Sequence, residues 1–193
     1  MEFRKADSTD IPAVMAIIGQ AQAYLREHGI DQWQNHYPNA ATIRRDIERK
    51  NSYVLQKDGK AVATVAVSFD GEKTYDRIYE GEWMSRGPYA VIHRIAVDDR
   101  WKGLGLFSLI VRHVEGLCRS RGVPCVRVDT HEKNRSMQSA LKKNSFQYCG
   151  VICLDDGSKR IAFEKAVPDA CSDDSGPPAA AGPRGDGILP GIV

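Results

Sequence analysis

The chain has 193 residues, the size of one domain, and it is long enough to bury one substantial core. Its 27 Lys and Arg residues nearly balance its 25 Asp and Glu residues, without the dense basic clusters typical of a nucleic-acid-binding protein. The sequence shows neither a signal-like N-terminal segment nor an apolar run of membrane-spanning length, so we expect a cytoplasmic protein that binds neither nucleic acid nor membrane.

The first half of the chain predicts two helices and a β-hairpin. Ser8 or Thr9 can cap the first helix. The pair Asp58-Gly59 predicts a tight turn between two strands. The aromatic-containing segment 29–38 has no periodic pattern and is predicted to be a loop between the helices. In chain order we expect a strand over 3–6, a helix over 8–29, a helix over 41–50, and strands over 52–56 and 61–69.

The second half predicts alternating strands and helices after a charged loop. Apolar residues recur at helical spacing after Gly105, which indicates a helix with one face in the core. The expected elements are a loop over 70–86, a strand over 89–97, a helix over 106–118, a strand over 124–130, a helix after residue 134, and strands over 146–154 and 160–164. This order predicts a mixed α/β fold with a largely antiparallel sheet and one crossover helix between two central strands. We expect a single domain over 1–167 and a disordered Pro/Gly/Ala-rich tail over 168–193.

The segment Arg100-Trp101-Lys102-Gly103-Leu104-Gly105 lies between a predicted strand and a predicted helix. The first amides of a helix have no internal partner, and glycines let an anion approach them closely. The segment is not a P-loop, because it lacks the Gly-Lys-Ser/Thr ending, and it is not a dinucleotide fingerprint, because Ser108 stands in place of the third glycine. The alternative is that the glycines only allow the helix to pack closely on the strand.

The strand, the Arg-x-x-Gly-x-Gly pattern, the helix and the downstream Asn134 together resemble the GNAT-type N-acetyltransferase superfamily, most specifically over 89–150. The resemblance implies a GNAT-like sheet that splays apart between its fourth and fifth strands, with acetyl-CoA bound there as co-substrate. Asn134 would hydrogen-bond the pantetheine arm, although it also suits a plain helix N-cap. The residues implied in cofactor binding are Ile95, Ala96, Val97, Arg100, Trp101, Lys102, Gly103, Leu104, Gly105, Leu106 and Asn134.

His93 is the candidate catalytic base, because an imidazole titrates near neutral pH. The run 93–97 resembles the same strand in arylalkylamine-type members of the superfamily, where a histidine is implicated as base through water. The alternative is a core or sheet-surface histidine with a satisfied hydrogen bond. Leu141 stands where the family often has a tyrosine that protonates the departing thiolate, which leaves water or Tyr148 for that role.

The resemblance places the acceptor pocket between the first two helices. Trp33 and Tyr37 are candidates for its walls, and Asp31 is a candidate to attract a cationic amine, although aromatics in such a loop at least as often pack against the core. Asp129, His131 and Glu132 are expected to face the thioester and are candidates to bind or deprotonate the amine. The alternative is that these groups at the end of a strand are only solvated.

These observations predict an N-acetyltransferase that moves an acetyl group from acetyl-CoA to a small-molecule primary amine by direct attack on the thioester. We expect no metal, because His131-Glu132 does not extend to a His-Glu-x-x-His pattern and no Cys-x-x-Cys exists. The alternative, motivated by Leu141, is a catalytically idle acyl-CoA-binding module. A homodimer is a candidate assembly.

Overall fold

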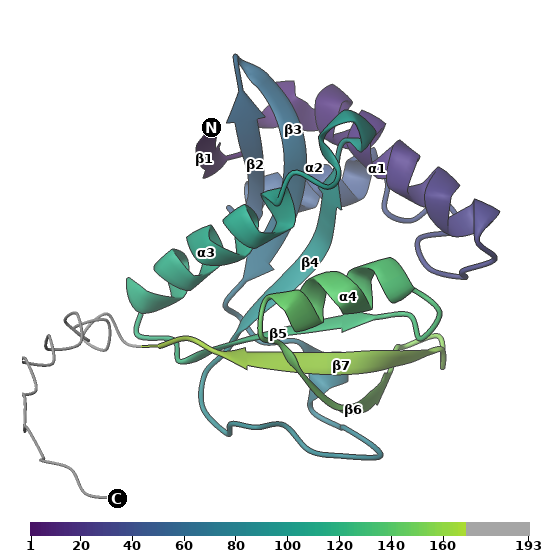
Figure 1. The fold of residues 1–193 in the computed structure, drawn as a ribbon, viewed down its shortest axis with the longest axis vertical. Coiled ribbons are helices and arrows are strands. Elements are labelled where there is room, and N and C mark those ends of the chain that lie inside the picture. Colours follow the sequence, from purple (N-terminus) through teal and green to yellow (C-terminus); the bar gives the residue numbers. More distant parts are fainter. Residues whose placement is uncertain (169–193) are drawn as a thin grey trace, which may run out of the picture.

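The computed structural model describes residues 1–168. The predicted tail therefore lies, beyond residue 168, outside the described residues. The elements follow the predicted order (Figure 1): β1 (Glu2–Lys5), η1 (Ser8–Asp10), α1 (Ile11–Glu27), α2 (Ala40–Glu48), β2 (Ser52–Lys57), β3 (Lys60–Ser68), η2 (Lys73–Tyr75), β4 (Ala90–Val97), η3 (Asp99–Trp101), α3 (Leu106–Arg119), β5 (Cys125–Thr130), α4 (Arg135–Lys143), β6 (Gln147–Cys153) and β7 (Lys159–Ala166).

The strands form one seven-stranded sheet in the order β1-β2-β3-β4-β5-β7-β6. Every neighbouring pair is antiparallel except β4 and β5, which are parallel. The β4–β5 ladder pairs only Ala90 with Val126 and Val91 with Arg127. Beyond that point the two strands diverge, so that β1–β4 and β5–β7 form two halves of a splayed sheet (Figure 1). The predicted fold class is confirmed.

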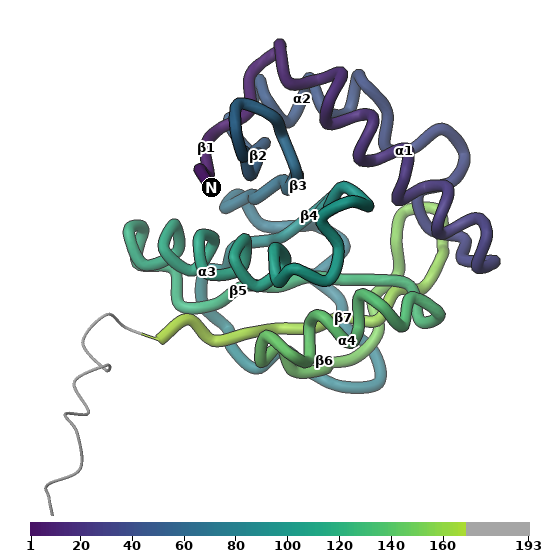
Figure 2. Tube along the Cα trace, turned by 45° about the horizontal axis from the view of Figure 1, so that its top comes forward, coloured from purple at the N-terminus to yellow at the C-terminus, as the bar shows by residue number. Residues whose placement is uncertain are grey.

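Helices cover both faces of the first half of the sheet. Along β2, Tyr53 and Leu55 belong to the main apolar cluster with α3, whereas Val54 between them packs with Val14 of α1 and Ile43 of α2. Successive strand residues point to opposite faces, so α3 lies on one face and α1 and α2 on the other. Figure 2 shows α1 and α2 together on one side of the molecule, away from α3 and α4.

One local prediction needs correction, and one gains detail. Neither Ser8 nor Thr9 caps the first helix: both lie in the short helix η1, which Asp7 caps by accepting a hydrogen bond from the Thr9 amide. The Asp10 carboxylate accepts a hydrogen bond from the Asp7 amide, and this reciprocal arrangement satisfies two amides at the start of η1. The segment 70–86 is the predicted loop; it contains the short helix η2, whose Tyr75 is 1% exposed and packs with Val91, Ile152 and Ala162.

Candidate active site

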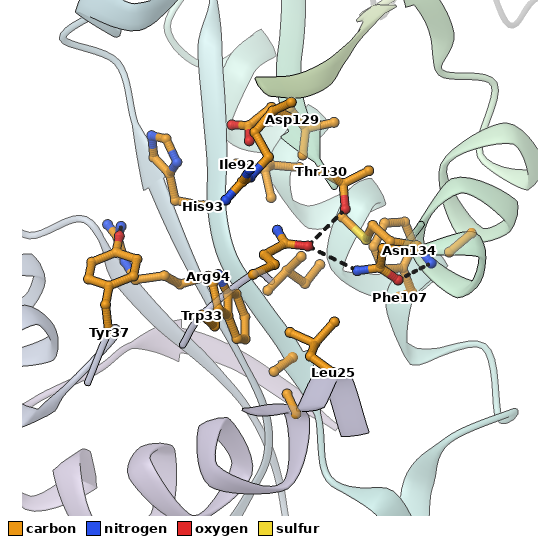
Figure 3. Close-up of a pocket in the computed structure, with 18 of the residues that line it drawn as sticks. Leu25, Trp33, Tyr37, Ile92, His93, Arg94, Phe107, Asp129, Thr130 and Asn134 are labelled. Atoms are coloured by element: carbon orange, nitrogen blue, oxygen red, sulfur yellow. Dashed lines mark hydrogen bonds between the residues drawn. The ribbon is translucent and has the colours of Figure 1, made fainter. Parts of the chain in front are cut away.

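A cavity of about 1070 Å³ opens where β4 and β5 diverge. Its lining comes from β4, from the loop between α1 and α2, from the start of α3 and from α4, which are far apart in sequence. Figure 3 shows His93 and Arg94 on the side of β4 and Thr130 and Asn134 across from them. The divergence of the two parallel strands therefore opens this cavity.

The glycine loop meets this cavity at the start of α3. Gly103 and Gly105 have φ values of 78° and 76°, the left-handed region that favours glycine. A Cβ atom built at either position would meet no heavy atom within 4 Å, so the loop leaves open space above its backbone. Gly105 is the N-cap of α3 and no side chain caps the helix. The exposed first-turn amides and the open space fit a phosphate group.

Most of the predicted cofactor residues line the cavity, and two do not. Arg100 donates its side-chain hydrogen bonds to Asp98, at 2.9 and 3.1 Å, and its side chain is 80% exposed. Leu104 is 64% exposed and does not belong to the cavity lining. The nine that line it are Ile95, Ala96, Val97, Trp101, Lys102, Gly103, Gly105, Leu106 and Asn134.

A bulge interrupts β4 at the edge of the cavity. His93 pairs with Ala66 and Ala96 pairs with Thr64, which leaves two β4 residues opposite one β3 residue. Arg94, in this bulge, has a φ of 50°. Its guanidinium donates to Asp46 of α2 at 2.7 and 2.8 Å and to the Tyr37 hydroxyl at 2.9 Å. Through Arg94, the bulge therefore connects β4 to the loop between α1 and α2. The extra bulge residue also leaves backbone groups of β4 without a hydrogen-bond partner in β3.

His93 faces a carboxylate that the sequence did not single out. Its Nε2 lies 3.3 Å from Oε2 of Glu72, with both side chains less than one-third exposed. This hydrogen bond is the largest cause that lowers the pKa of Glu72 from 4.5 to about 2, and bonds from Thr74 add to it. Glu72 is therefore ionised at neutral pH and can stabilise a positive charge on the imidazole.

Asn134 and Gln32 close the cavity on the α4 side. Asn134 caps α4, because its Oδ1 accepts from the Met137 amide at 3.1 Å, while its Nδ2 donates to Gln32 Oε1 at 3.2 Å. The same Gln32 oxygen accepts from the Thr130 hydroxyl at 3.3 Å. The plain N-cap interpretation of Asn134 thus describes the structure, and its Nδ2 keeps a second N–H that the bond to Gln32 does not use.

The structure brings four of the six predicted acceptor residues to the cavity: Asp31, Trp33, Tyr37 and Asp129. Asp129 accepts a 2.7 Å hydrogen bond from the Tyr75 hydroxyl. Burial, and then Asp129, raise the pKa of that phenol well above its usual value. His131 and Glu132 are outside the cavity lining, and Nδ1 of His131 accepts from the Lys133 amide at 3.1 Å. Burial lowers the pKa of His131.

Sequence reasoning missed Glu72, Gln32 and Asp46, because a polar residue in a loop or on a helix carries no sign of its distant partner. One signal was present for the bulge: His93 and Arg94 are consecutive polar residues in an otherwise apolar strand. Successive side chains of a regular strand point to opposite faces of the sheet. A bulge changes the direction of one side chain, so two consecutive polar residues can both reach a site on one face.

Within residues 1–168, no group of three or more His, Cys, Asp or Glu side chains is placed to hold a metal ion. Over the same residues, no helix combines the length and the apolar character needed to cross a membrane.

A sequence profile of the acetyltransferase (GNAT) family matches residues 18–146. The chain belongs to this family. The GNAT structure of an acetyltransferase from Streptococcus agalactiae 2603 superposes with a TM-score of 0.76 and 38% identity, over 86% of this chain and 94% of that one. The ribosomal-protein-S18-alanine N-acetyltransferase of Escherichia coli shares the fold, with a TM-score of 0.58 and 16% identity over 89% and 97% of the two chains.

A curated relative, the S-alkylcysteine N-acetyltransferase of Bacillus subtilis (strain 168), is 25% identical over 116 residues. The match spans 58% of this chain and 58% of that protein. Together with the seven-stranded splayed sheet, these findings confirm the predicted GNAT superfamily and support acyl transfer as its general chemistry.

Proposed function

We propose that the chain is an N-acetyltransferase that moves the acetyl group of acetyl-CoA to the primary amine of a small molecule. One observation carries the proposal: the Glu72–His93 pair and the Gly103–Gly105 loop line one cavity at the splay. The loop supplies a phosphate site, and the pair supplies a base within the same space. A small acceptor is supported by the printed name of the B. subtilis relative, an S-alkylcysteine N-acetyltransferase.

In this reaction His93 takes a proton from the acceptor amine, directly or through one water, and Glu72 stabilises the resulting imidazolium. The amine nitrogen forms a bond to the acetyl carbon as the bond from that carbon to sulfur breaks. Backbone groups released by the β4 bulge are placed to stabilise negative charge on the carbonyl oxygen.

The sulfur leaves as a thiolate and then takes a proton from water. Leu141 is 0% exposed in the core, so it offers no acid, and Tyr148 is 52% exposed and packs on Phe163 outside the cavity lining. A thiol with a pKa of about 8.5 is a tolerable leaving group without an acid.

The experiment is a thiol-release assay with acetyl-CoA and a panel of small amines. We expect amine-dependent release of CoA, and we expect His93→Gln to lower kcat by about 10²- to 10⁴-fold with little change in the KM for acetyl-CoA. His113→Gln is the matched control, because His113 stacks on Phe3, away from the cavity.

Three results would redirect the proposal. Binding of acetyl-CoA without release by any amine or peptide indicates an idle acyl-CoA-binding module. Release only with a peptide amino terminus replaces the small molecule by a protein acceptor. Unchanged turnover in His93→Gln across pH removes His93 from the mechanism.

A further inference from the structure

Arg160 is a buried cation on the wall of the cavity. It lies near the start of β7, is 9% exposed and belongs to the lining. Its Nη1 donates to the Lys159 carbonyl at 2.8 Å and its Nη2 to the Asp31 carbonyl at 3.4 Å. A guanidinium has more donors than these two bonds use, and carbonyl oxygens carry no full negative charge.

The other well-buried arginines are compensated by carboxylates. Arg127 pairs with Glu164 at 3.1 Å, and Arg94 pairs with Asp46 at 2.7 Å. In the described part of the chain, no Asp or Glu forms an ion pair with Arg160. A buried charge is costly unless it is paired, so the lack of a carboxylate at this one position needs an explanation.

Two acidic residues lie close to Arg160 without forming an ion pair with it. Asp156, in the turn before β7, accepts hydrogen bonds from the Ser158 hydroxyl and amide, and these lower its pKa with a smaller contribution from the charge of Arg160. The backbone carbonyl of Asp31 accepts the hydrogen bond from Arg160, and Asp31 as a whole is exposed. Arg160 therefore keeps donors for a group that enters the cavity.

The sheet register places Arg160 in the acceptor part of the cavity. β7 pairs Ala162 with Asp129, and Arg160 is two residues from Ala162, so Arg160 and Asp129 belong to the same face of the sheet. The bond to Asp31 also ties Arg160 to the loop between α1 and α2.

We infer that the acceptor amine also carries a carboxylate, which Arg160 binds; this rests on the proposed N-acetyltransferase function. A guanidinium binds a carboxylate in bidentate geometry, and such charge-assisted bonds are strong in a partly buried site. The same cavity is lined by Asp31, Glu72 and Asp129, which suit the ammonium end of the acceptor. An amino acid presents both charges on one small molecule.

The test compares acceptors that differ only in the carboxylate: methionine with methioninamide, phenylalanine with phenylalaninamide, and β-alanine with β-alaninamide. We expect the carboxylate member of at least one pair to have a kcat/KM higher by about tenfold or more. In Arg160→Gln this preference should disappear, because the kcat/KM of the carboxylate member falls to that of the amide member. Arg160→Lys should retain part of the preference.

Lys159→Gln is the matched control. Lys159 is exposed, adjacent in sequence and outside the cavity lining, so its replacement removes one positive charge and should leave the preference intact. Turnover of the amide members reports whether Arg160→Gln is folded. If that variant does not fold, the paired acceptors on the unmodified chain still decide whether the acceptor carries a carboxylate, and Arg160→Lys tests the role of Arg160.

The outcomes separate the two proposals. If amines release CoA but all three pairs react equally, the carboxylate site is wrong and the N-acetyltransferase function stands. A preference that survives in Arg160→Gln also overturns the role of Arg160. If no acceptor releases CoA, the proposed function fails and the carboxylate site fails with it.

Discussion

At the scale of single residues, the Glu72–His93 pair predicts a pH dependence of stability. The folded state holds the pKa of Glu72 at about 2, below the ordinary value of 4.5. The pair therefore adds to the free energy of unfolding above pH 4.5, and this contribution is lost as the pH falls towards about 2. We expect His93→Gln to flatten the decline of unfolding free energy over this range, measured by urea unfolding at a series of pH values.

Two further variants make this measurement decisive. Glu72→Gln removes the titrating carboxyl itself, together with the bonds it accepts from Thr74, so it should flatten the decline at least as much as His93→Gln does. His28→Gln changes an exposed histidine at the end of α1 and should keep the slope of the unmodified chain. A slope in His93→Gln equal to that of the unmodified chain would contradict a stabilising Glu72–His93 bond.

At the scale of elements, the turn into α3 predicts a specific loss of cofactor affinity. Ala in place of Gly105 must adopt a φ near 76°, which costs about 1–2 kcal/mol, and its Cβ projects into open space. That space is where a phosphate would approach the helix amides. We expect Gly105→Ala to raise the KM for acetyl-CoA by about tenfold, with a smaller change in kcat, in steady-state thiol-release kinetics.

Gly59→Ala separates strain from the loss of phosphate contact. Gly59, in the turn between β2 and β3, has a φ of 75° and lies outside the cavity lining. It should lose similar stability and keep the KM for acetyl-CoA. Equal KM values in the two variants would show that the loop does not approach the phosphates.

The start of α3 could be predicted from the sequence, whereas the long-range contacts of the cavity could not. Gly105 and the apolar residues after it define the start of α3 within one chain segment, and the structure begins the helix at Leu106. The Glu72–His93 and Arg160–Asp31 contacts join residues 21 and 129 positions apart in the chain, and periodicity carries no information about such pairs. Asn134 combines the two cases. The local sequence predicts that it caps α4, but it does not predict the hydrogen bond from Asn134 to Gln32.

At the scale of the whole molecule, the splayed sheet predicts that acetyl-CoA stabilises both halves together. Only two registered pairs connect β4 and β5, yet one apolar cluster continues across them, with Ile92 and Val128 both in it. A ligand that fills the space between the halves contacts both of them, so it should oppose their separation. At about a hundred times its Kd, the ligand adds about 2.7 kcal/mol to the free energy of unfolding.

For a domain of this size that gain corresponds to a rise in Tm of roughly 5–11 °C, measured by calorimetry with and without acetyl-CoA. We expect a single unfolding transition that shifts to higher temperature with acetyl-CoA, because the shared apolar cluster couples the two halves of the sheet. Two transitions of which only one moves would mean that the ligand binds within one half. Gly105→Ala at the same ligand concentration should show a smaller rise, since stabilisation by mass action falls as Kd increases.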